Sequence, residues 1–83
     1  MEKLLISLYV TSLQQQFDLF VPGALPLRSL IPLITEGLVE LSGGRYQPSG
    51  RELLCVRRPD VLLDGSMSLE DYRLHNGEEL ILY

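Results

Sequence analysis

The last residues of the chain constrain its fold most strongly, because residues 80–83 form a bare apolar run, Leu-Ile-Leu-Tyr. Such a run is stable in water only when it is paired inside a sheet. Residues 64–77 precede it with an Asp-Gly pair and an Asn-Gly pair, and both pairs are turn signals. Between the two pairs, Leu69 and Tyr72 can point the same way from a segment too short for a helix of its own. The C-terminal part therefore predicts a compact turn plugged by apolar side chains, followed by a central strand.

Two alternating segments open the chain. Residues 3–11 and residues 16–21 both place apolar side chains at every second position, which is typical of half-buried strands. Only the short polar segment 12–15 separates them. This pattern predicts a β-hairpin.

The hydrophobic period then changes. In residues 27–41, apolar residues recur at spacings of three and four, as in an amphipathic helix. Pro32 is a difficulty, because proline costs about 3 kcal/mol inside a helix but little in the first turn. We therefore expect a regular helix that begins near Ser29, with Ser29 as its N-cap, or else a kinked entry from Leu27. Gly37 costs about 1 kcal/mol relative to alanine in mid-helix, and we expect it to permit close packing on the sheet.

The remaining segments complete the order of elements. Residues 42–50 are rich in glycine and proline and predict a flexible surface loop. Residues 53–56 predict a third strand and residues 61–63 a short fourth one, joined by a turn at 57–60. The order ββαβ(β)β predicts a single α+β domain over residues 1–83, with the β-grasp arrangement. In this arrangement one helix crosses a mixed sheet of four to five strands, and the final strand lies parallel to the first in the middle.

Composition excludes several classes of function. A net charge of −4 disfavours a general nucleic-acid binder, which needs a basic excess. A single cysteine excludes an internal disulfide and a cysteine metal cluster. No run approaches the roughly 20 apolar residues of a membrane span, and no signal peptide follows Met1. We expect a cytoplasmic protein without direct membrane insertion.

The sequence shows no group of residues suited to catalysis. His75 is the only histidine and lies in a predicted turn, so no metal site or base–nucleophile pair is visible. Cys55 lies inside a predicted strand and is interpreted as a core thiol. Asp71 and Tyr72 are interpreted as structural, the first capping the plugged turn and the second packing under it. We therefore predict no enzyme, no metal and no cofactor.

Three segments carry a resemblance to a known family. They are Phe-Asp-Leu-Phe-Val-Pro at residues 17–22, Leu-Pro-Leu at residues 25–27, and Asp-Tyr-Arg-Leu-His-Asn-Gly-Glu-Glu-Leu at residues 71–80. In these the chain resembles the YukD/EsaB family, small ubiquitin-like proteins of bacterial type VII (WXG100) secretion systems. It is also similar to the ubiquitin-like cytosolic domain of actinobacterial membrane subunits of the same system.

The resemblance extends over essentially the whole chain and implies the ubiquitin fold. It also implies a cytoplasmic, non-conjugated accessory or regulatory component, which acts by binding cytosolic parts of the secretion membrane complex and needs no cofactor. We expect a monomer or a weak homodimer. Two alternatives stay open: a ubiquitin-like protein modifier, and a generic adaptor domain unrelated to secretion. The modifier needs a Gly-Gly end, whereas this chain stops at Tyr83 and has a single lysine, Lys3.

The predicted partner-binding surface follows from strand alternation. If Leu53 and Cys55 point toward the helix, Leu54 and Val56 point to the other face of the sheet. In the final strand, Ile81 and Tyr83 point to that same face if Leu80 and Leu82 point toward the helix. The resulting exposed patch consists of Leu54, Val56, Ile81 and Tyr83, flanked by Arg57 and Arg58. Such a patch commonly marks an interface, and the arginines would steer an acidic partner toward it. The alternatives are a homodimer contact, ordinary half-buried strand residues and a solvated polar edge.

Overall fold

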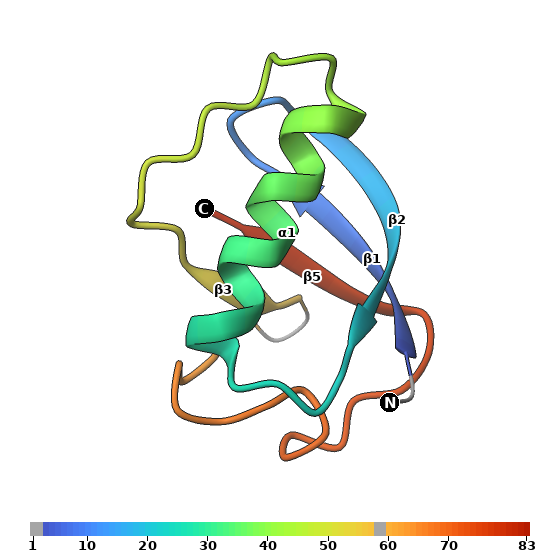
Figure 1. Ribbon diagram of the computed structural model, residues 1–83. Helices are drawn as coiled ribbons and strands as arrows, with labels where there is room; N and C mark the ends of the chain where they lie inside the picture. The colour runs from blue at the N-terminus through green and yellow to red at the C-terminus, as the bar shows by residue number, and fades with distance from the viewer. Residues whose placement is uncertain (1–2, 58–59) are drawn as a thin grey trace.

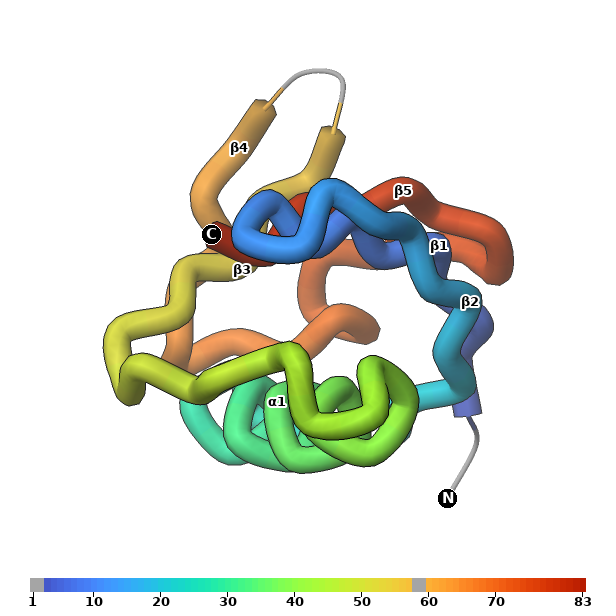
Figure 2. The backbone as a smooth tube through the Cα atoms, turned by 90° about the horizontal axis from the view of Figure 1, so that it is seen from above, coloured from blue at the N-terminus to red at the C-terminus, as the bar shows by residue number. Residues whose placement is uncertain are grey.

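The computed structural model describes residues 3–57 and 60–83 as two layers, a five-stranded sheet and one helix that crosses a single face of it (Figures 1 and 2). The strands are β1 Lys3–Val10, β2 Gln15–Pro22, β3 Leu54–Val56, β4 Val61–Leu62 and β5 Glu78–Leu82, and the helix is α1 Leu27–Leu41. Part of the predicted turn at residues 57–60 lies outside the described residues. No helix in the described ranges has the length and apolar character to cross a membrane.

The sheet has the strand order β2-β1-β5-β3-β4. The final strand β5 runs parallel to β1 and lies between β1 and β3, while the other pairings are antiparallel. The apolar run that ends the chain is therefore paired on both sides, as the sequence predicted. The β-grasp arrangement with a mixed sheet and one helix is confirmed.

The helix begins at Leu27, and the prediction that Ser29 caps it is wrong. Pro26 occupies the N-cap position without a side-chain hydrogen bond. The first N–H groups of a helix lack partners within the helix. Here backbone carbonyls of the plugged turn accept two of them: Leu27 N donates to Met67 O at 2.8 Å, and Arg28 N donates to Gly65 O at 2.9 Å. Backbone carbonyls of the plugged turn thus cap the helix. A cap of this kind cannot be predicted from the side chains of the helix itself.

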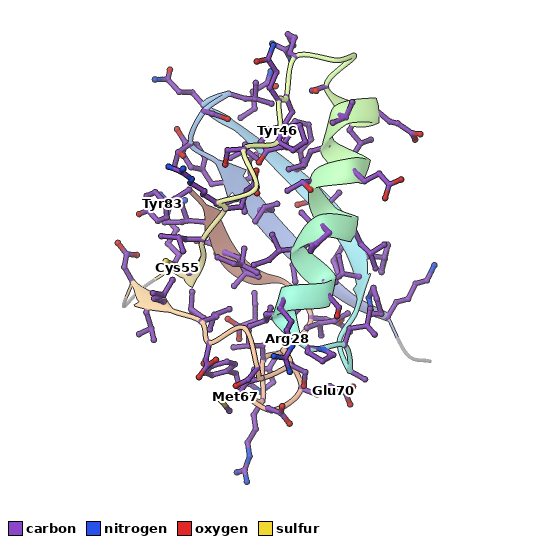
Figure 3. All side chains as sticks on the ribbon, turned by 60° about the vertical axis from the view of Figure 1, so that its left-hand side comes forward. Arg28, Tyr46, Cys55, Met67, Glu70 and Tyr83 are labelled. Atoms are coloured by element: carbon purple, nitrogen blue, oxygen red, sulfur yellow. The ribbon has the colours of Figure 1, made fainter. Side chains whose placement is uncertain are left out.

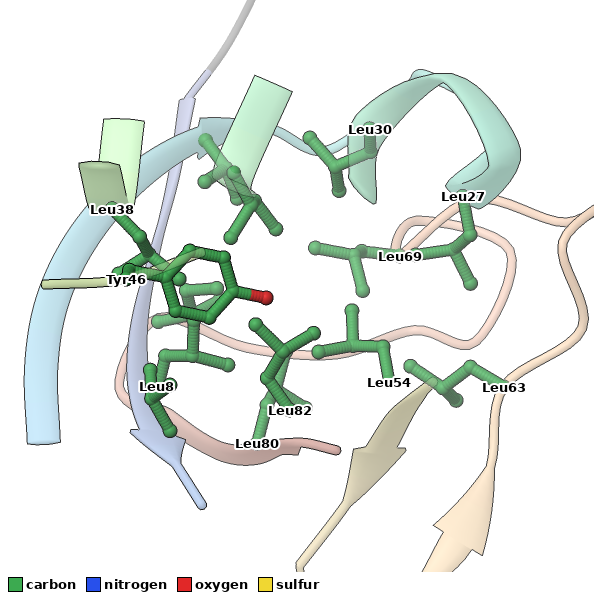
Figure 4. Packing of buried hydrophobic residues seen from close by; sticks show 14 residues of the cluster. Leu8, Leu27, Leu30, Leu38, Tyr46, Leu54, Leu63, Leu69, Leu80 and Leu82 are labelled. Carbon is green, nitrogen blue, oxygen red and sulfur yellow. The ribbon is translucent and has the colours of Figure 1, made fainter. Parts of the chain in front are cut away.

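The core lies between α1 and the facing side of the sheet (Figure 4). Leucines dominate it, and those buried most completely include Leu8, Leu30, Leu38, Leu69 and Leu80. Burying one such side chain contributes about 1.5–3 kcal/mol relative to leaving it exposed. Leu69 comes from the plugged turn and is 0% exposed, so the predicted apolar plug is confirmed.

Polar side chains hold the plugged turn around Leu69. Ser68 N donates to Asp71 Oδ2 at 2.9 Å, and Asp71 N donates to Ser68 Oγ at 3.1 Å. This reciprocal pair satisfies two backbone donors at once, as a capping box does at a helix start. Tyr72 packs against the core, and its hydroxyl accepts a hydrogen bond from Asp64 N at 2.8 Å. The structural roles predicted for Asp71 and Tyr72 are confirmed.

The segment that joins α1 to β3 is a surface loop as predicted, but Tyr46 within it is buried. Tyr46 is only 5% exposed, and its ring points into the core (Figure 4). Its backbone N–H donates to Ser42 Oγ at 2.8 Å, and its hydroxyl donates to Glu52 Oε2 at 3.1 Å. Ser49 N donates to the same carboxylate oxygen at 2.6 Å. Hydrogen bonds therefore hold the segment near both of its ends. It runs from α1 to β3 along one side of the molecule (Figure 2).

Candidate protein-binding surface

The side chains of β3 face opposite to the prediction. Leu54 is 1% exposed and belongs to the core, and Val56 packs against that core. The pairing with β5 explains this, because Leu54 lies opposite Leu82 and Val56 lies opposite Leu80. Directly opposed residues in a ladder share one face of the sheet. The predicted inclusion of Leu54 and Val56 in an exposed patch is therefore wrong.

The neighbours of these residues occupy the outer face instead, which is the face away from α1. Leu53 is 50% exposed, contrary to the predicted orientation in which it points toward the helix. It pairs with Tyr83 through two hydrogen bonds, from Leu53 N to Tyr83 O at 3.2 Å and from Tyr83 N to Leu53 O at 2.9 Å. Tyr83 is 53% exposed and lies on the outer face as predicted. The structure thus brings Tyr83 together with Leu53, which sequence alternation alone had assigned to the opposite face.

A row of paired residues crosses four strands beside this pair. Tyr9 lies opposite Ile81, Ile81 opposite Cys55, and Cys55 opposite Leu62. Ile81 and Cys55 are each 8% exposed, whereas Leu62 is 57% exposed. Ile81 therefore faces outward as predicted, but its neighbours cover it.

We define the outer patch as the exposed side chains and the covered ones on which they rest. The exposed members are Leu53, Leu62 and Tyr83, and the covered or half-buried members are Tyr9, Cys55 and Ile81. Figure 3 shows Cys55 and Tyr83 on the side of the sheet away from α1. The patch therefore consists of two exposed aliphatic side chains and one exposed aromatic ring, which rest on side chains that are covered or half-buried.

Arg57 borders the outer patch. Its guanidinium carbon lies 5.8 Å from the centroid of the Tyr9 ring. Tyr9 is on β1 and Arg57 follows β3, so this contact reaches across the outer side of β5, which lies between them. A cation–π contact of this kind contributes about 0.5–1 kcal/mol at an exposed site. Arg57 thus presents a positive charge beside the apolar patch, while Arg58 lies outside the described residues.

The single cysteine and the single histidine of the chain lie in different surroundings. Burial, together with the nearby charge of Asp60, raises the pKa of the Cys55 thiol, which keeps it in the poorly nucleophilic protonated form. Cys55 is buried as predicted, but on the outer face of the sheet rather than under the helix. His75 is exposed in its turn, with Nδ1 at 3.2 Å from Glu78 Oε1. Among the described residues, no three His, Cys, Asp or Glu side chains are grouped so that they could hold a metal ion.

Comparison with known proteins gives one family match. The family model described as "WXG100 protein secretion system (Wss), protein YukD" matches residues 5–82. No curated protein sequence matches the chain.

Solved structures with the same fold include domains of type VII secretion proteins. The EccD5 ubiquitin-like domain from Mycobacterium xenopi superposes with a TM-score of 0.80 at 15% identity, over 100% of this chain and 94% of that one. The ubiquitin-like domain of the Mycobacterium tuberculosis protein ECCD1 gives 0.73 at 21% identity, over 99% and 98%. A chain of the MycP5-free ESX-5 inner membrane complex gives 0.70 at 17% identity, over 100% of this chain but 21% of that one. At these identities the likeness establishes the ubiquitin-like fold.

Proposed function

Since the chain belongs to the YukD family of the WXG100 protein secretion system, we propose that it is a non-enzymatic, non-conjugated protein-binding module of a type VII secretion system. In this role it is a cytoplasmic accessory or regulatory component, and its partner is a cytosolic part of the secretion membrane complex. The family match over residues 5–82 supports the link to secretion. The ESX-5 inner membrane complex supports the kind of partner, since a domain of the same fold occurs there within a longer chain.

The outer patch is the observation that carries the proposal. Leu53, Leu62 and Tyr83 expose about half of their surface each, at 50%, 57% and 53%. Contiguous exposed apolar groups on a small domain mark interaction sites, and aromatic side chains and arginine are enriched at the centres of protein interfaces. In the proposed complex the three exposed side chains contact apolar groups of the partner. Arg57 pairs with an acidic group at the rim, where charge affects orientation and association rate more than affinity.

The surroundings of the patch favour binding over chemistry. The thiol nearest the exposed side chains has a raised pKa, and the one histidine pairs with Glu78 in an exposed turn. Covalent catalysis needs a nucleophile with a base within hydrogen-bond reach, and a thiol with a raised pKa and a histidine that contacts Glu78 do not form such a pair. The patch therefore supports recognition without a covalent step.

Affinity capture from the native host tests this function. The wild-type protein, the double variant Leu53→Ser/Tyr83→Ser and the single variant Leu41→Ser serve as baits, followed by mass spectrometry. Leu41 is the matched control, because it is 57% exposed but lies on α1.

We expect wild type and Leu41→Ser to recover subunits of the secretion membrane complex, and the double variant to recover at least about tenfold less. Circular dichroism and thermal unfolding establish that all three baits are folded. Equal recovery by the double variant would exclude the outer patch as the docking surface. Recovery of unrelated proteins, or of covalent ladders on many targets, would contradict the secretion role itself.

A further inference from the structure

The strand β2 forms one edge of the sheet, and no strand of the described residues pairs with its outer side. It is eight residues long and pairs with β1 without a break, from Lys3 opposite Pro22 to Val10 opposite Gln15. The other edge strand, β4, is only two residues long. A short edge strand offers little template for further pairing, whereas a long, regular one does. The two edges of this sheet therefore differ in what they can bind.

Hydrogen bonds of β1 show which backbone groups of β2 are free. Leu5 N donates to Asn76 Oδ1 at 2.9 Å, and Leu5 O accepts from Gly77 N at 2.8 Å, so the backbone groups of Leu5 face β5. Because these directions alternate along a strand, Ile6 faces β2 and bonds within the pair that it forms with Leu19. The N–H and C=O groups of Phe20, one residue further, then point away from β1 to the open edge, and the same holds for Asp18. Apart from the β1–β2 ladder, no backbone hydrogen bond from the described residues reaches residues 16–22.

An apolar groove accompanies this open edge. It lies between β2 and α1, has a volume of about 150 Å³, and is lined by residues 19–22 of the strand and by Leu30, Leu33, Ile34 and Gly37 of the helix. An apolar cavity of about this volume holds a benzene ring, so the groove can take a branched aliphatic side chain.

Gly37 keeps the groove open. A Cβ built on Gly37 meets no atom within 4 Å, so the missing side chain leaves free space rather than a close contact with the sheet. The sequence-based expectation that Gly37 permits close packing is wrong for this reason. Leu33, one turn earlier on α1, is 50% exposed along the same groove. The helix thus presents a small and a large apolar position beside the free edge of β2.

The outer side of β2 adds a second apolar contact. Phe20 is 68% exposed, more than any other large apolar side chain of the described residues. It lies opposite Leu5, whose side chain shares the outer face. Apart from Asp18, β2 carries no charged residue and its register shows no bulge, although charges and bulges are the usual protection of an edge strand.

We propose that β2 binds an extended, basic–aliphatic peptide of a partner protein as an additional strand of the sheet. Alternate side chains of the peptide point to opposite faces. One set of aliphatic side chains enters the groove over Gly37 and Leu33, and the other set lies beside Phe20 and Asp18. Backbone hydrogen bonds to Asp18 and Phe20 supply affinity, and the groove supplies specificity, as in other cases of strand addition. This site is separate from the outer patch and does not depend on the proposed secretion role.

Charge identifies the occupant. Asp18 stands on β2, and the exposed Glu36 and Glu40 on α1 follow Leu33 and Gly37 by three residues each, so they lie on the same side of the helix. A peptide with Lys or Arg on both sides of its aliphatic residues complements this acidic rim. A second copy of the chain would bring two acidic rims together at a net charge of −4 per copy, and like charges disfavour such pairing.

The probe is the capped peptide acetyl-Lys-Ile-Val-Ile-Lys-amide, whose order is the same in both directions. It is titrated into ¹⁵N-labelled protein, and amide chemical shifts are followed by NMR. We expect saturable shifts at Asp18, Phe20, Leu33 and Gly37, with a Kd below about 1 mM. The peptide acetyl-Glu-Ile-Val-Ile-Glu-amide has the same apolar residues and is expected to bind at least about tenfold more weakly.

Variants separate this site from the outer patch. Gly37→Leu fills the groove and is also a better helix former than glycine, so it is expected to stay folded and to weaken binding by at least about tenfold. Leu33→Ser is a second groove variant with the same expected loss, while Leu53→Ser/Tyr83→Ser is expected to bind like wild type. Shifts confined to the outer patch, no saturable shift at millimolar peptide, or full binding by Gly37→Leu would each overturn the proposal. A dimer that forms through β2 without peptide would also overturn it, in favour of a second copy as the occupant.

Discussion

The two faces of the sheet differ most clearly at two neighbouring leucines. Leu54 is 1% exposed beneath α1, whereas Leu53 is 50% exposed on the outer face. The residues have the same chemistry, so their roles follow from strand pairing: Leu54 lies opposite Leu82 in the core, and Leu53 bonds to Tyr83. The face under the helix contributes the core, and the outer face leaves Leu53 and Tyr83 exposed.

Removal of Tyr46 is expected to have the largest effect, because its ring closes the helix-covered face at 5% exposure. Tyr46→Ala should lower the free energy of unfolding by about 3–5 kcal/mol, as for other buried aromatic residues. Tyr46→Phe keeps the ring and loses only the hydrogen bond to Glu52, so it should cost about 1 kcal/mol. Urea unfolding measures both values. A loss below about 1 kcal/mol for Tyr46→Ala would mean that the ring is not part of the core.

The neighbouring leucines give the next largest difference. Leu54→Ala should cost about 2–5 kcal/mol because it leaves a cavity in the core. Leu53→Ala should change stability by no more than about 0.5 kcal/mol, as expected at a surface position. The same urea experiment compares the two variants. The reverse order would show that β3 faces the way the sequence pattern alone predicted.

A pH titration tests whether the Tyr46 phenol is buried on the helix-covered face, without a substitution that leaves a cavity. Burial, and then the hydrogen bond to Glu52 and its charge, raise the pKa of Tyr46 from 10.0 to about 12. The folded state therefore favours the neutral phenol, and its contribution to stability is complete below pH 10 and is lost as the pH rises toward 12. Wild type should lose stability relative to Tyr46→Phe over this interval in thermal unfolding. Parallel curves for the two proteins would indicate that the phenol is solvated in the folded state.

A smaller effect, of opposite sign, is expected at Gly37. Since a Cβ there meets nothing within 4 Å, Gly37→Ala should raise the free energy of unfolding by about 0.5–1 kcal/mol through helix propensity alone. The midpoint of urea unfolding at unchanged slope gives the value. Destabilisation would mean that the helix approaches the sheet more closely at this position than the structure shows.

The fold was largely predictable because its signals are periodic. Alternation in residues 3–11 and 16–21, the helical spacing in residues 27–41 and the terminal apolar run together specify the order of elements and the central place of β5. The spacing of Leu69 and Tyr72 likewise predicts that both belong to the plugged turn. Each of these inferences depends on a pattern that repeats or on a turn residue with a known backbone preference.

The errors arose where no periodic signal exists. Leu53 and Leu54 are adjacent and identical, so alternation fits both orientations of β3, and only the pairing with β5 decides between them. Tyr46 stands alone in a segment rich in glycine and proline, where a single aromatic residue gives no period. The start of α1 is capped by backbone carbonyls of Gly65 and Met67, which lie far away in sequence and have no side-chain signature. These three features are tertiary, and the candidate surface was misplaced because it depended on the first of them.

Site-specific photo-crosslinking in the native host tests the binding role of the outer face most directly. A benzophenone amino acid replaces Tyr83 in one variant and Leu41 in another, since both side chains are exposed, at 53% and 57%, but Leu41 lies on α1. After irradiation, mass spectrometry identifies the crosslinked proteins. We predict that the Tyr83 position crosslinks to a cytosolic part of a secretion membrane-complex subunit and that the Leu41 position does not. Crosslinks to such a subunit from the Leu41 position alone would contradict the assignment of binding to the outer face.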